Sequence, residues 1–296
     1  MNIGVCENRQ LYAAYHAIYK APDINCHDWQ EEMEILQAED TCFFVFEGKS
    51  LLGGFVLNGT KISLPFVVAP FSDKKAFWEA VLSWAREQYP DNYVDVYHIP
   101  QEDADILLRM GARKKWAQQR MCRPTDNFKP ELGSAFLYEA PQKKDCSDIV
   151  QAVYQAHKQG YTATVYGPPD LSEIHRMISY RLEAFEKTNT LHFSIVARDI
   201  RTNEIAGVCM AGIYPDSRNH FSTIHQVSVR PEYQNRGLAR SMMQYSISAA
   251  HSTSPVITLQ VLIGNPAVHL YEKLGFVAGP SFTDMVYNKN DAARCD

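Results

Sequence analysis

Two segments in the second half of the chain carry residue types that could do chemistry. In the first, an expected strand that ends with His-Gln-Val-Ser-Val at 225–229 leads through Arg230-Pro231 into the turn 234–239, Gln-Asn-Arg-Gly-Leu-Ala. An amphipathic helix is expected to start directly after this turn, at 238–250. Such a turn leaves several backbone N–H groups unpaired at the positive end of a helix dipole. The segment therefore predicts a phosphate or diphosphate site built from main-chain amides.

The side chains of this turn favour the same interpretation. Gly237 allows the backbone to approach a ligand closely, and Ala239 keeps that approach clear. Arg236 and Arg240 can add positive charge. The expected contacts with the anion come from Gln234, Asn235, Arg236, Gly237, Leu238, Ala239 and Arg240.

The second segment is 265–276, Asn-Pro-Ala-Val-His-Leu-Tyr-Glu-Lys-Leu-Gly-Phe, which follows an expected buried strand at 256–262. Asn265 is a plausible N-cap for a short helix at 266–274. Tyr271, with an ordinary pKa near 10, stays protonated at pH 7 and can donate a proton to a departing group.

Together the two segments resemble the GNAT superfamily of acyl-CoA-dependent N-acyltransferases. The stretch V-x-P-x-x-Q-x-x-G-x-A resembles the loop that binds the acyl-CoA pyrophosphate, and A-x-x-L-Y-E-K-L-G-F resembles the later motif whose tyrosine lies near the CoA sulfur. The resemblance implies direct transfer of an acetyl group from acetyl-CoA to a primary amine of a small molecule or amino acid, with Tyr271 as the acid.

The resemblance also implies roles for the strand before the loop. Backbone groups at Val227, Ser228 and Val229 would pair with the pantetheine arm and polarise the thioester carbonyl. Asn265 would join the cofactor contacts. However, Asn265 and Ala267 are two positions apart, where the family usually has three, so Asn265 could cap the helix without reaching the arm.

Deprotonation of the amine is the larger chemical problem. An alkylamine with a pKa near 10.4 is only about 0.04% neutral at pH 7. The glutamate base that the family often has on this strand is absent, and His225 and Gln226 stand there instead. His225 is the base candidate, because a regular strand would point it to the same face as Val227 and Val229. A purely structural histidine is the alternative.

The resemblance implies that the acceptor pocket lies at a loop, 160–169, that contains Tyr161, Thr162, Thr164, Tyr166 and Gly167. The tyrosines would either stack on the amine or cover the core. His157, just before this loop, is interpreted as a surface residue of the helix 147–158. No His, Cys, Met or Trp spacing predicts a metal site.

Periodicity and turn residues predict an α/β (α+β) chain whose two halves repeat one order of elements. Expected strands are 42–46, 51–57, 62–68, 93–98, 135–139, 192–197, 205–213, 221–229, 256–262 and strand-like pieces in 276–288; expected helices are 11–19, 29–37, 72–88, 103–110, 147–158, 170–187, 238–250 and 266–274. Ala69-Pro70 matches Arg230-Pro231 at an offset of 161, and Met110-Gly111 matches Leu274-Gly275 at an offset of 164.

The repeat predicts two tandem GNAT-like domains, each a mixed, mostly antiparallel sheet flanked by helices. A degenerate domain at 1–123 and a linker at 124–132 would precede a catalytic domain at 133–296. The first copy has Asp73 to Trp78 opposite 234–239, without a glycine, and Leu107 opposite Tyr271. We therefore expect one acyl-CoA site per chain, in the second half.

Composition narrows the remaining classes. Hydrophobic residues make up 46% of the 296 positions, which excludes a disordered or low-complexity chain. No apolar run reaches the ~18 residues of a membrane span, no secretory signal is visible, and the seven cysteines form no CxxC pair, so we expect a cytoplasmic protein with reduced thiols. The net charge of −5 and the lack of a basic stripe argue against nucleic acid, and weakly favour a cationic substrate.

Three functions stay open on the sequence. The first is a small-molecule N-acetyltransferase, the second an acetyltransferase acting on protein or peptide amines, and the third a non-catalytic acyl-CoA sensor. The sequence leaves a homodimer open and does not identify the acceptor.

Overall fold

A computed structural model describes residues 1–21, 27–71, 73–89, 93–127, 129–217 and 220–288. The chain forms two compact units. Met1–Gln119 and the residues from Pro280 onward make up the first unit, and Arg120–Gly279 make up the second. Cys26, Cys295, residue 72 of the expected helix 72–88 and residue 128 of the expected linker lie outside the described residues.

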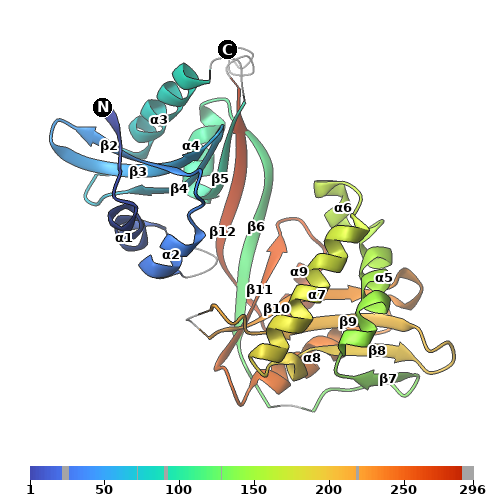
Figure 1. Cartoon of the computed structure of the whole chain (residues 1–296). Coiled ribbons are helices and arrows are strands. Elements are labelled where there is room, and N and C mark those ends of the chain that lie inside the picture. The colour runs from blue at the N-terminus through green and yellow to red at the C-terminus, as the bar shows by residue number, and fades with distance from the viewer. Residues whose placement is uncertain (22–26, 72, 90–92, 128, 218–219, 289–296) are drawn as a thin grey trace. The chain divides into compact units, whose positions relative to one another are not determined.

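The first unit is a sheet with helices on both faces (Figure 1). Its strand order is β1-β2-β3-β4-β5-β12. One face packs on α3 and α4 through a core that includes Phe77, Trp78 and Leu107, and the other packs on α1 through Tyr12. The elements are β1 (Asn2–Val5), α1 (Arg9–Tyr19), α2 (Trp29–Ile35), β2 (Thr41–Glu47), β3 (Ser50–Asn58), β4 (Lys61–Val67), α3 (Lys74–Gln88), β5 (Val94–Pro100) and α4 (Gln101–Arg109).

The second unit has the strand order β6-β11-β10-β9-β8-β7. One face of this sheet is covered by α5 and α7 and the other by α8 (Figure 1). The elements are β6 (Arg113–Pro124), β7 (Phe136–Glu139), α5 (Cys146–His157), α6 (Tyr161–Tyr166), α7 (Leu171–Lys187), β8 (Ile195–Asp199), β9 (Ile205–Gly212), β10 (Ser222–Val229), α8 (Leu238–Ala250), β11 (Val256–Leu262), α9 (Val268–Lys273) and β12 (Val277–Tyr287), with short 3-10 turns at Lys143–Asp145, Leu191–Phe193 and Pro231–Tyr233.

The two units repeat the same local structure, as the sequence predicts. In each unit, a strand, a Pro turn and a long helix lead to a strand parallel to the first: β4 with β5, and β10 with β11. A short helix then ends in a glycine with positive φ, 88° at Gly111 and 84° at Gly275. The residue after each glycine donates its backbone N–H to the carbonyl five residues earlier, Leu107 in the first unit and Tyr271 in the second. These bonds make Leu107 the structural counterpart of Tyr271.

Several expected elements differ from the structure. The expected loop 160–169 contains the helix α6, which begins after Gly160 and ends at Gly167 with a φ of 85°. A long strand, β6, covers 113–124, where no element was expected, because its charged sequence Arg-Lys-Lys-Trp hides the strand pattern. The expected strand 192–197 begins with the 3-10 turn Leu191–Phe193, and β8 starts only at Ile195.

The boundary between the units also differs from the boundary expected from the sequence. It falls inside β6, at Gln119, before the segment 124–132. The end of β12 belongs to the first unit, because residues 282–287 pair with β5 and Met285 and Tyr287 enter the first unit's core. The chain therefore returns to its first unit after the second is complete.

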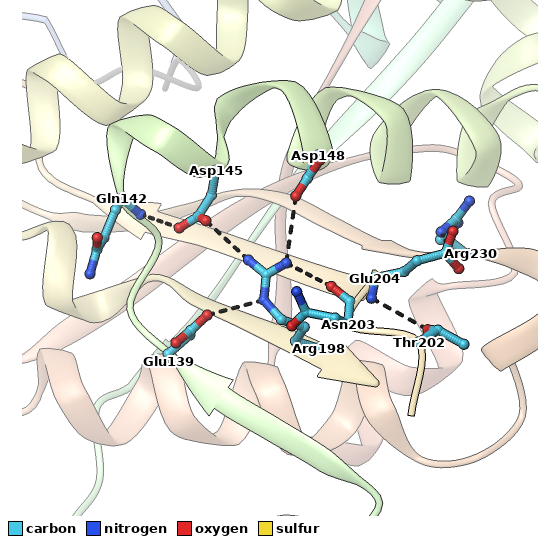
Figure 2. A network of polar contacts seen from close by, with 9 residues as sticks. All are labelled: Glu139, Gln142, Asp145, Asp148, Arg198, Thr202, Asn203, Glu204 and Arg230. Atoms are coloured by element: carbon cyan, nitrogen blue, oxygen red, sulfur yellow. Dashed lines mark hydrogen bonds and ion pairs between the residues drawn. The ribbon is translucent and has the colours of Figure 1, made fainter. Parts of the chain in front are cut away.

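A buried arginine ties together the edge of the second unit (Figure 2). Arg198 on β8 is 8% exposed and contacts Asp145 at 3.0 Å, Glu139 at 3.2 Å and Asp148 at 3.5 Å. It also donates to the Asn203 carbonyl at 2.9 Å. One side chain thus links β7, the start of α5 and the turn after β8. A buried charge requires partners of this kind.

Candidate functional site

β10 separates from β11 part-way along its length. The parallel ladder between them covers Ser222, Thr223 and Ile224 only. On its other side β10 stays paired with β9 as far as Val229. In the described part of the chain, the edge of β10 at Val227, Ser228 and Val229 that faces β11 therefore has no neighbouring strand. A ligand with amide groups could pair with this free edge by strand addition.

A β-bulge at His225 corrects the expected direction of that side chain. The register with β9 shifts between Ile224 and Gln226, so His225 is the extra residue. Its ring packs on Phe185 and Tyr214, at centroid distances of 5.5 Å and 4.5 Å, on the face covered by α5 and α7. Val227 and Val229 belong to the core on the α8 face. The expectation that His225 shares their face was wrong, because the strand is not regular.

The environment of His225 does not suit a strong base. Burial, and secondarily the nearby Arg181 cation, lower the pKa of His225 to about 3. Its Nε2 is buried and has no hydrogen-bond partner among the described residues. Moving a proton from an ammonium group with a pKa near 10.4 to an imidazole with a pKa near 3 costs roughly 10 kcal/mol.

The turn between β10 and α8 presents open backbone donors. Asn235 and Gly237 have φ values of 60° and 80°, and Gly237 is the N-cap of α8, with no side-chain cap. None of the N–H groups from Asn235 to Arg240 has a hydrogen-bond acceptor in the described ranges. A Cβ at Gly237 would meet nothing within 4 Å, so the space over the turn is open.

The side chains of the turn have separate positions. Gln234 points inward and donates from Nε2 to the Val229 carbonyl at 3.0 Å, which braces the turn against β10. Arg236 donates to the Glu232 carbonyl at 2.8 Å and packs on the Tyr233 ring. Neither Arg236 nor Arg240 forms an ion pair with a described acidic residue. Leu238 is buried under the helix start and Ala239 is partly buried. The exposed surface of the turn therefore combines free amides with two cations.

Tyr271 lies on α9 and packs against the core on the α8 face, with Phe276 beside it. Burial, and secondarily the Cys209 thiol, raise the pKa of Tyr271 to about 12. Cys209 is paired with Val227 in the sheet, so Tyr271 lies near the part of β10 that has separated from β11. Its hydroxyl has no hydrogen-bond partner within the described residues.

The expectation that Asn265 is the N-cap of the helix at 266–274 was wrong, because α9 begins only at Val268, and its N-cap is Ala267, without a side-chain cap bond. The Asn265 Oδ1 accepts from the Ala267 N–H at 3.0 Å, in the turn that leads into α9. This bond leaves the Asn265 amide N–H₂ group with no partner in the part of the chain that the structure describes.

A polar cluster that the sequence analysis missed lies on the α5/α7 face of β10. His157 Nε2 is 2.8 Å from Gln226 Nε2 and 3.1 Å from Ser228 Oγ. Gln226 also donates to Ser228 Oγ at 2.8 Å. His157 is therefore a partly buried partner of β10 and not a surface residue, and burial lowers its pKa. The sequence gives little indication of this, because the helix is amphipathic whether His157 faces the sheet or the solvent.

Two of the residues expected to line the acceptor pocket already form hydrogen bonds within the protein. Tyr161, at the start of α6, donates to the Ile263 carbonyl at 2.8 Å, and a Cβ at Gly264 would overlap its hydroxyl. Tyr161 therefore fixes α6 to the turn between β11 and α9. Thr164 bonds to the Tyr161 carbonyl, whereas Tyr166 is 53% exposed.

The sequence profile of the acetyltransferase (GNAT) family matches residues 150–276, which include the separated strands, the open turn and α9. This part of the chain is a GNAT acetyltransferase domain. A search of curated proteins gave no match. Because the matched residues all lie in the second unit, that unit is called the GNAT domain.

Solved structures resemble the chain over both units. A GCN5-related N-acetyltransferase from Sphaerobacter thermophilus has 17% identity and a TM-score of 0.69, covering 97% of this chain and 95% of its own. A tandem GNAT protein from the clavulanic acid biosynthesis pathway has 11% identity and a TM-score of 0.60, covering 97% and 98%. A GNAT-family acetyltransferase from Colwellia psychrerythraea has 11% identity and a TM-score of 0.60, covering 97% and 100%. The chain therefore has the tandem GNAT-like fold.

In the first unit, the turn that corresponds to 234–239 is occupied by one of its own side chains. Asp73 is the N-cap of α3, and its carboxylate accepts from the Ala76 N–H at 2.9 Å. Bonds to the N-cap carbonyl, from Phe77 to Asp73 and from Ser241 to Gly237, show that Asp73 corresponds to Gly237. The expected alignment, which set Asp73 opposite Gln234, is corrected by three residues. A carboxylate thus stands where the GNAT domain has a glycine and open space.

Among the described residues, no group of three His, Cys, Asp or Glu side chains is arranged to hold a metal ion, and no helix is long and apolar enough to span a bilayer.

Proposed function

We propose that the GNAT domain binds acetyl-CoA and transfers its acetyl group to a primary amine of a small molecule or amino acid. The observation that carries this proposal is the row of unpaired N–H groups from Asn235 to Arg240, under open space and beside two arginines that have no acidic partner among the described residues. A diphosphate would satisfy these donors and find positive charge around it. The free edge of β10 supports the same placement, because a pantetheine arm carries amide groups that can pair with it.

Acetyl-CoA would supply the acetyl group as a thioester; the amine nitrogen forms a bond to the carbonyl carbon, the C–S bond breaks, and the amine loses a proton. Backbone N–H groups of Val227 and Val229, which point away from β9, would polarise the carbonyl. The Tyr271 hydroxyl would donate a hydrogen bond to the departing sulfur. Because its pKa is about 12, Tyr271 stays neutral and stabilises charge on the sulfur without giving up its proton completely.

His225 is not the base in this proposal, because its pKa of about 3 and its direction argue against that role. The amine would react from its own neutral fraction, or pass its proton to water. The protein would act in the cytoplasm on a small-molecule amine, without nucleic acid or membrane partners.

Titration calorimetry with acetyl-CoA tests the binding half of the proposal. We expect one site per chain, because Asp73 fills the corresponding place in the first unit. Gly237→Ala should weaken binding at least about tenfold, since the Cβ enters the open space and a side chain strains a φ of 80°. Gly59→Ala is the matched control, because Gly59 also has positive φ, 56°, and open space at its Cβ, but lies in the first unit.

Thiol release from acetyl-CoA in the presence of an amine panel tests the catalytic half. Turnover with free amines and not with peptides supports the proposal. Binding without turnover of any amine would instead identify a sensor, and turnover restricted to peptides would identify a protein acetyltransferase. Absence of acetyl-CoA binding, or two equivalent sites, would contradict the proposal itself.

A further inference from the structure

An arginine without an acidic partner reaches over β10 on the α5/α7 face of the GNAT domain. Arg181 on α7 donates from Nε to the Tyr214 hydroxyl at 3.3 Å and from Nη1 to Gln226 Oε1 at 3.4 Å. Both acceptors are neutral and both bonds are long. No described carboxylate lies within ion-pair distance of this partly buried cation. Arg198 and Arg230, in the same unit, each bind at least two carboxylates.

Hydrogen-bonding groups of Arg181 and its neighbours are left without partners in the described structure. A guanidinium offers five N–H donors in a fork that matches a carboxylate, and the neighbours of Arg181 take two of them. His225 Nε2 is buried beside it without a partner in the described chain. The rings of Tyr214 and Tyr180 form an aromatic wall at 5.5 Å centroid distance, and Tyr180 is 51% exposed. Burial, and secondarily the Asp216 carboxylate, raise the pKa of Tyr180, so this surface carries one acidic group near Tyr180 as well as the Arg181 cation.

The position of Arg181 connects it to the transfer chemistry. Its partner Gln226 directly precedes Val227, where β10 begins to offer a free edge on the β11 side. A group bound to Arg181 therefore lies next to the strand segment that would hold the thioester. The bulge at His225 produces this arrangement, because it turns two consecutive side chains, His225 and Gln226, toward α7.

We propose that Arg181 binds a carboxylate of the amine acceptor, so that the acceptor is an amino acid and not a simple alkylamine or polyamine. This inference rests on the proposed acetyl transfer and narrows its substrate class. It also reverses the weak expectation from the net charge of −5, because the charged side chain that contacts Gln226 on β10 is a cation, Arg181.

Matched pairs of acceptors test the inference. Glycine, β-alanine, 4-aminobutyrate and L-phenylalanine are compared with methylamine, ethylamine, propylamine and phenethylamine, which lack only the carboxylate. Binding to the full-length protein is measured by calorimetry without acetyl-CoA, and kcat/KM by thiol release with it. We expect at least one amino acid to exceed its amine by about 100-fold in kcat/KM and to bind detectably better.

Arg181→Gln should reduce this preference to a few-fold, and Arg181→Lys should restore only part of it, because the charge returns without the fork. Arg176→Gln is the matched control, since Arg176 is an exposed residue of the same helix and has no hydrogen bond or ion pair among the described residues. It should leave the preference unchanged.

The outcomes separate this inference from the proposed function. If acetyl-CoA binds and amines react as well as amino acids, the carboxylate site is overturned and acetyl transfer survives. If acetyl-CoA does not bind but amino acids bind in an Arg181-dependent way, acetyl transfer fails and the site stands. If Arg181→Gln does not fold, the wild-type pairs and Arg181→Lys decide: equal affinity within every wild-type pair overturns the inference.

Discussion

Gly237 and Arg240 illustrate how single residues determine the chemistry at the end of β10. Gly237 starts α8 with a φ of 80° and no side chain, so the amides around it stay exposed and open, and Arg240 adds a cation beside them. In the first unit Asp73 occupies the position that corresponds to Gly237. Its carboxylate accepts a hydrogen bond from a backbone amide of its own helix start, that of Ala76. A change of one residue type at one helix start thus separates a turn whose amides stay open, where we propose that a diphosphate binds, from a turn in which a carboxylate accepts from one amide.

Tyr271→Phe tests the proposed hydrogen bond to the leaving sulfur. Removing the hydroxyl should lower kcat at least about tenfold, because charge on the sulfur loses its donor. The affinity for acetyl-CoA should stay within about twofold, as the ring and its packing on Phe276 remain. Pre-steady-state thiol release and calorimetry measure the two quantities. An unchanged kcat would remove Tyr271 from the mechanism.

The pH dependence of kcat/KM should follow the acceptor and not the enzyme. Burial lowers the pKa of both His157 and His225, the latter to about 3 with Arg181 as a second cause, so neither imidazole takes up a proton above pH 7. The pKa of Tyr271, about 12, lies above the assay range. The neutral fraction of the amine rises tenfold per pH unit up to its own pKa, so kcat/KM should rise with unit slope.

The rise in kcat/KM should level off near the amine pKa of each acceptor, which is about 10.4 for an ω-amino acid and lower for an α-amino acid, whose amine is less basic. Profiles from pH 6 to 10.5 for one acceptor of each kind measure this. An inflection near pH 6.5 that is common to both acceptors, and that disappears in His157→Asn or His225→Asn, would instead assign the base to that histidine.

At the scale of elements, the site depends on where strands stop pairing. β10 pairs with β9 from Thr223 to Val229, apart from the bulged His225, but it pairs with β11 over three residues only, and the bulge lies at the point where β10 and β11 separate. Gln234 closes one end of the open section by bonding to the Val229 carbonyl. Tyr161 fixes α6 to the turn after β11. The free edge of β10 is thus held by contacts around it.

Arg198→Met tests what holds the opposite edge of the same sheet. The change leaves Asp145, whose side chain is 5% exposed, without its cation, and should lower the free energy of unfolding of the GNAT domain by about 3 kcal/mol. Chemical denaturation followed by circular dichroism measures the loss. Arg201→Met is the control, because the side chain of Arg201 is 80% exposed and its ion pair should contribute less than about 1 kcal/mol.

Adding Asp145→Asn to Arg198→Met should recover part of this stability, because the unpaired buried charge is then gone. A double variant as unstable as the sum of both single changes would mean that the two side chains act independently.

At the scale of the whole molecule, the chain order and the structural units do not coincide. The last strand, β12, starts in the GNAT domain and ends in the first unit, where residues 282–287 pair with β5. The residues that complete the core of the first unit therefore come after the whole of the second unit, Arg120–Gly279, in the sequence. Its Met285 and Tyr287 are almost fully buried there.

Met285→Ala should destabilise the first unit by about 2–5 kcal/mol, although it lies near the C-terminus. All four tryptophans, Trp29, Trp78, Trp84 and Trp116, belong to the first unit, so tryptophan fluorescence reports its unfolding selectively. Val277→Ala, on the same strand but 67% exposed, should change the fluorescence transition little. Equal effects of both substitutions would show that β12 contributes no core to the first unit.

The sequence by itself determined the features that depend on neighbouring residues. The glycine turn 234–239, the helix α8 and the repeated order of elements follow from local propensity and spacing, and the structure contains them all. The GNAT-like fold and its tandem arrangement follow from the same local motifs. The sequence analysis missed the helix α6. Its end is marked by a positive φ at Gly167, and a glycine permits this conformation but does not require it.

Only the tertiary structure decided which groups meet across the sheet. A bulge of one residue moved His225 to the face of α7, because side chains alternate along a strand and an extra residue reverses the alternation. It brought Arg181 to Gln226 and His157 to Ser228, residues 45 and 71 positions apart. Likewise, β12 joined β5 from the far end of the chain. Pairing and burial at such separations depend on the packing of the whole fold, and no local pattern of residues encodes them.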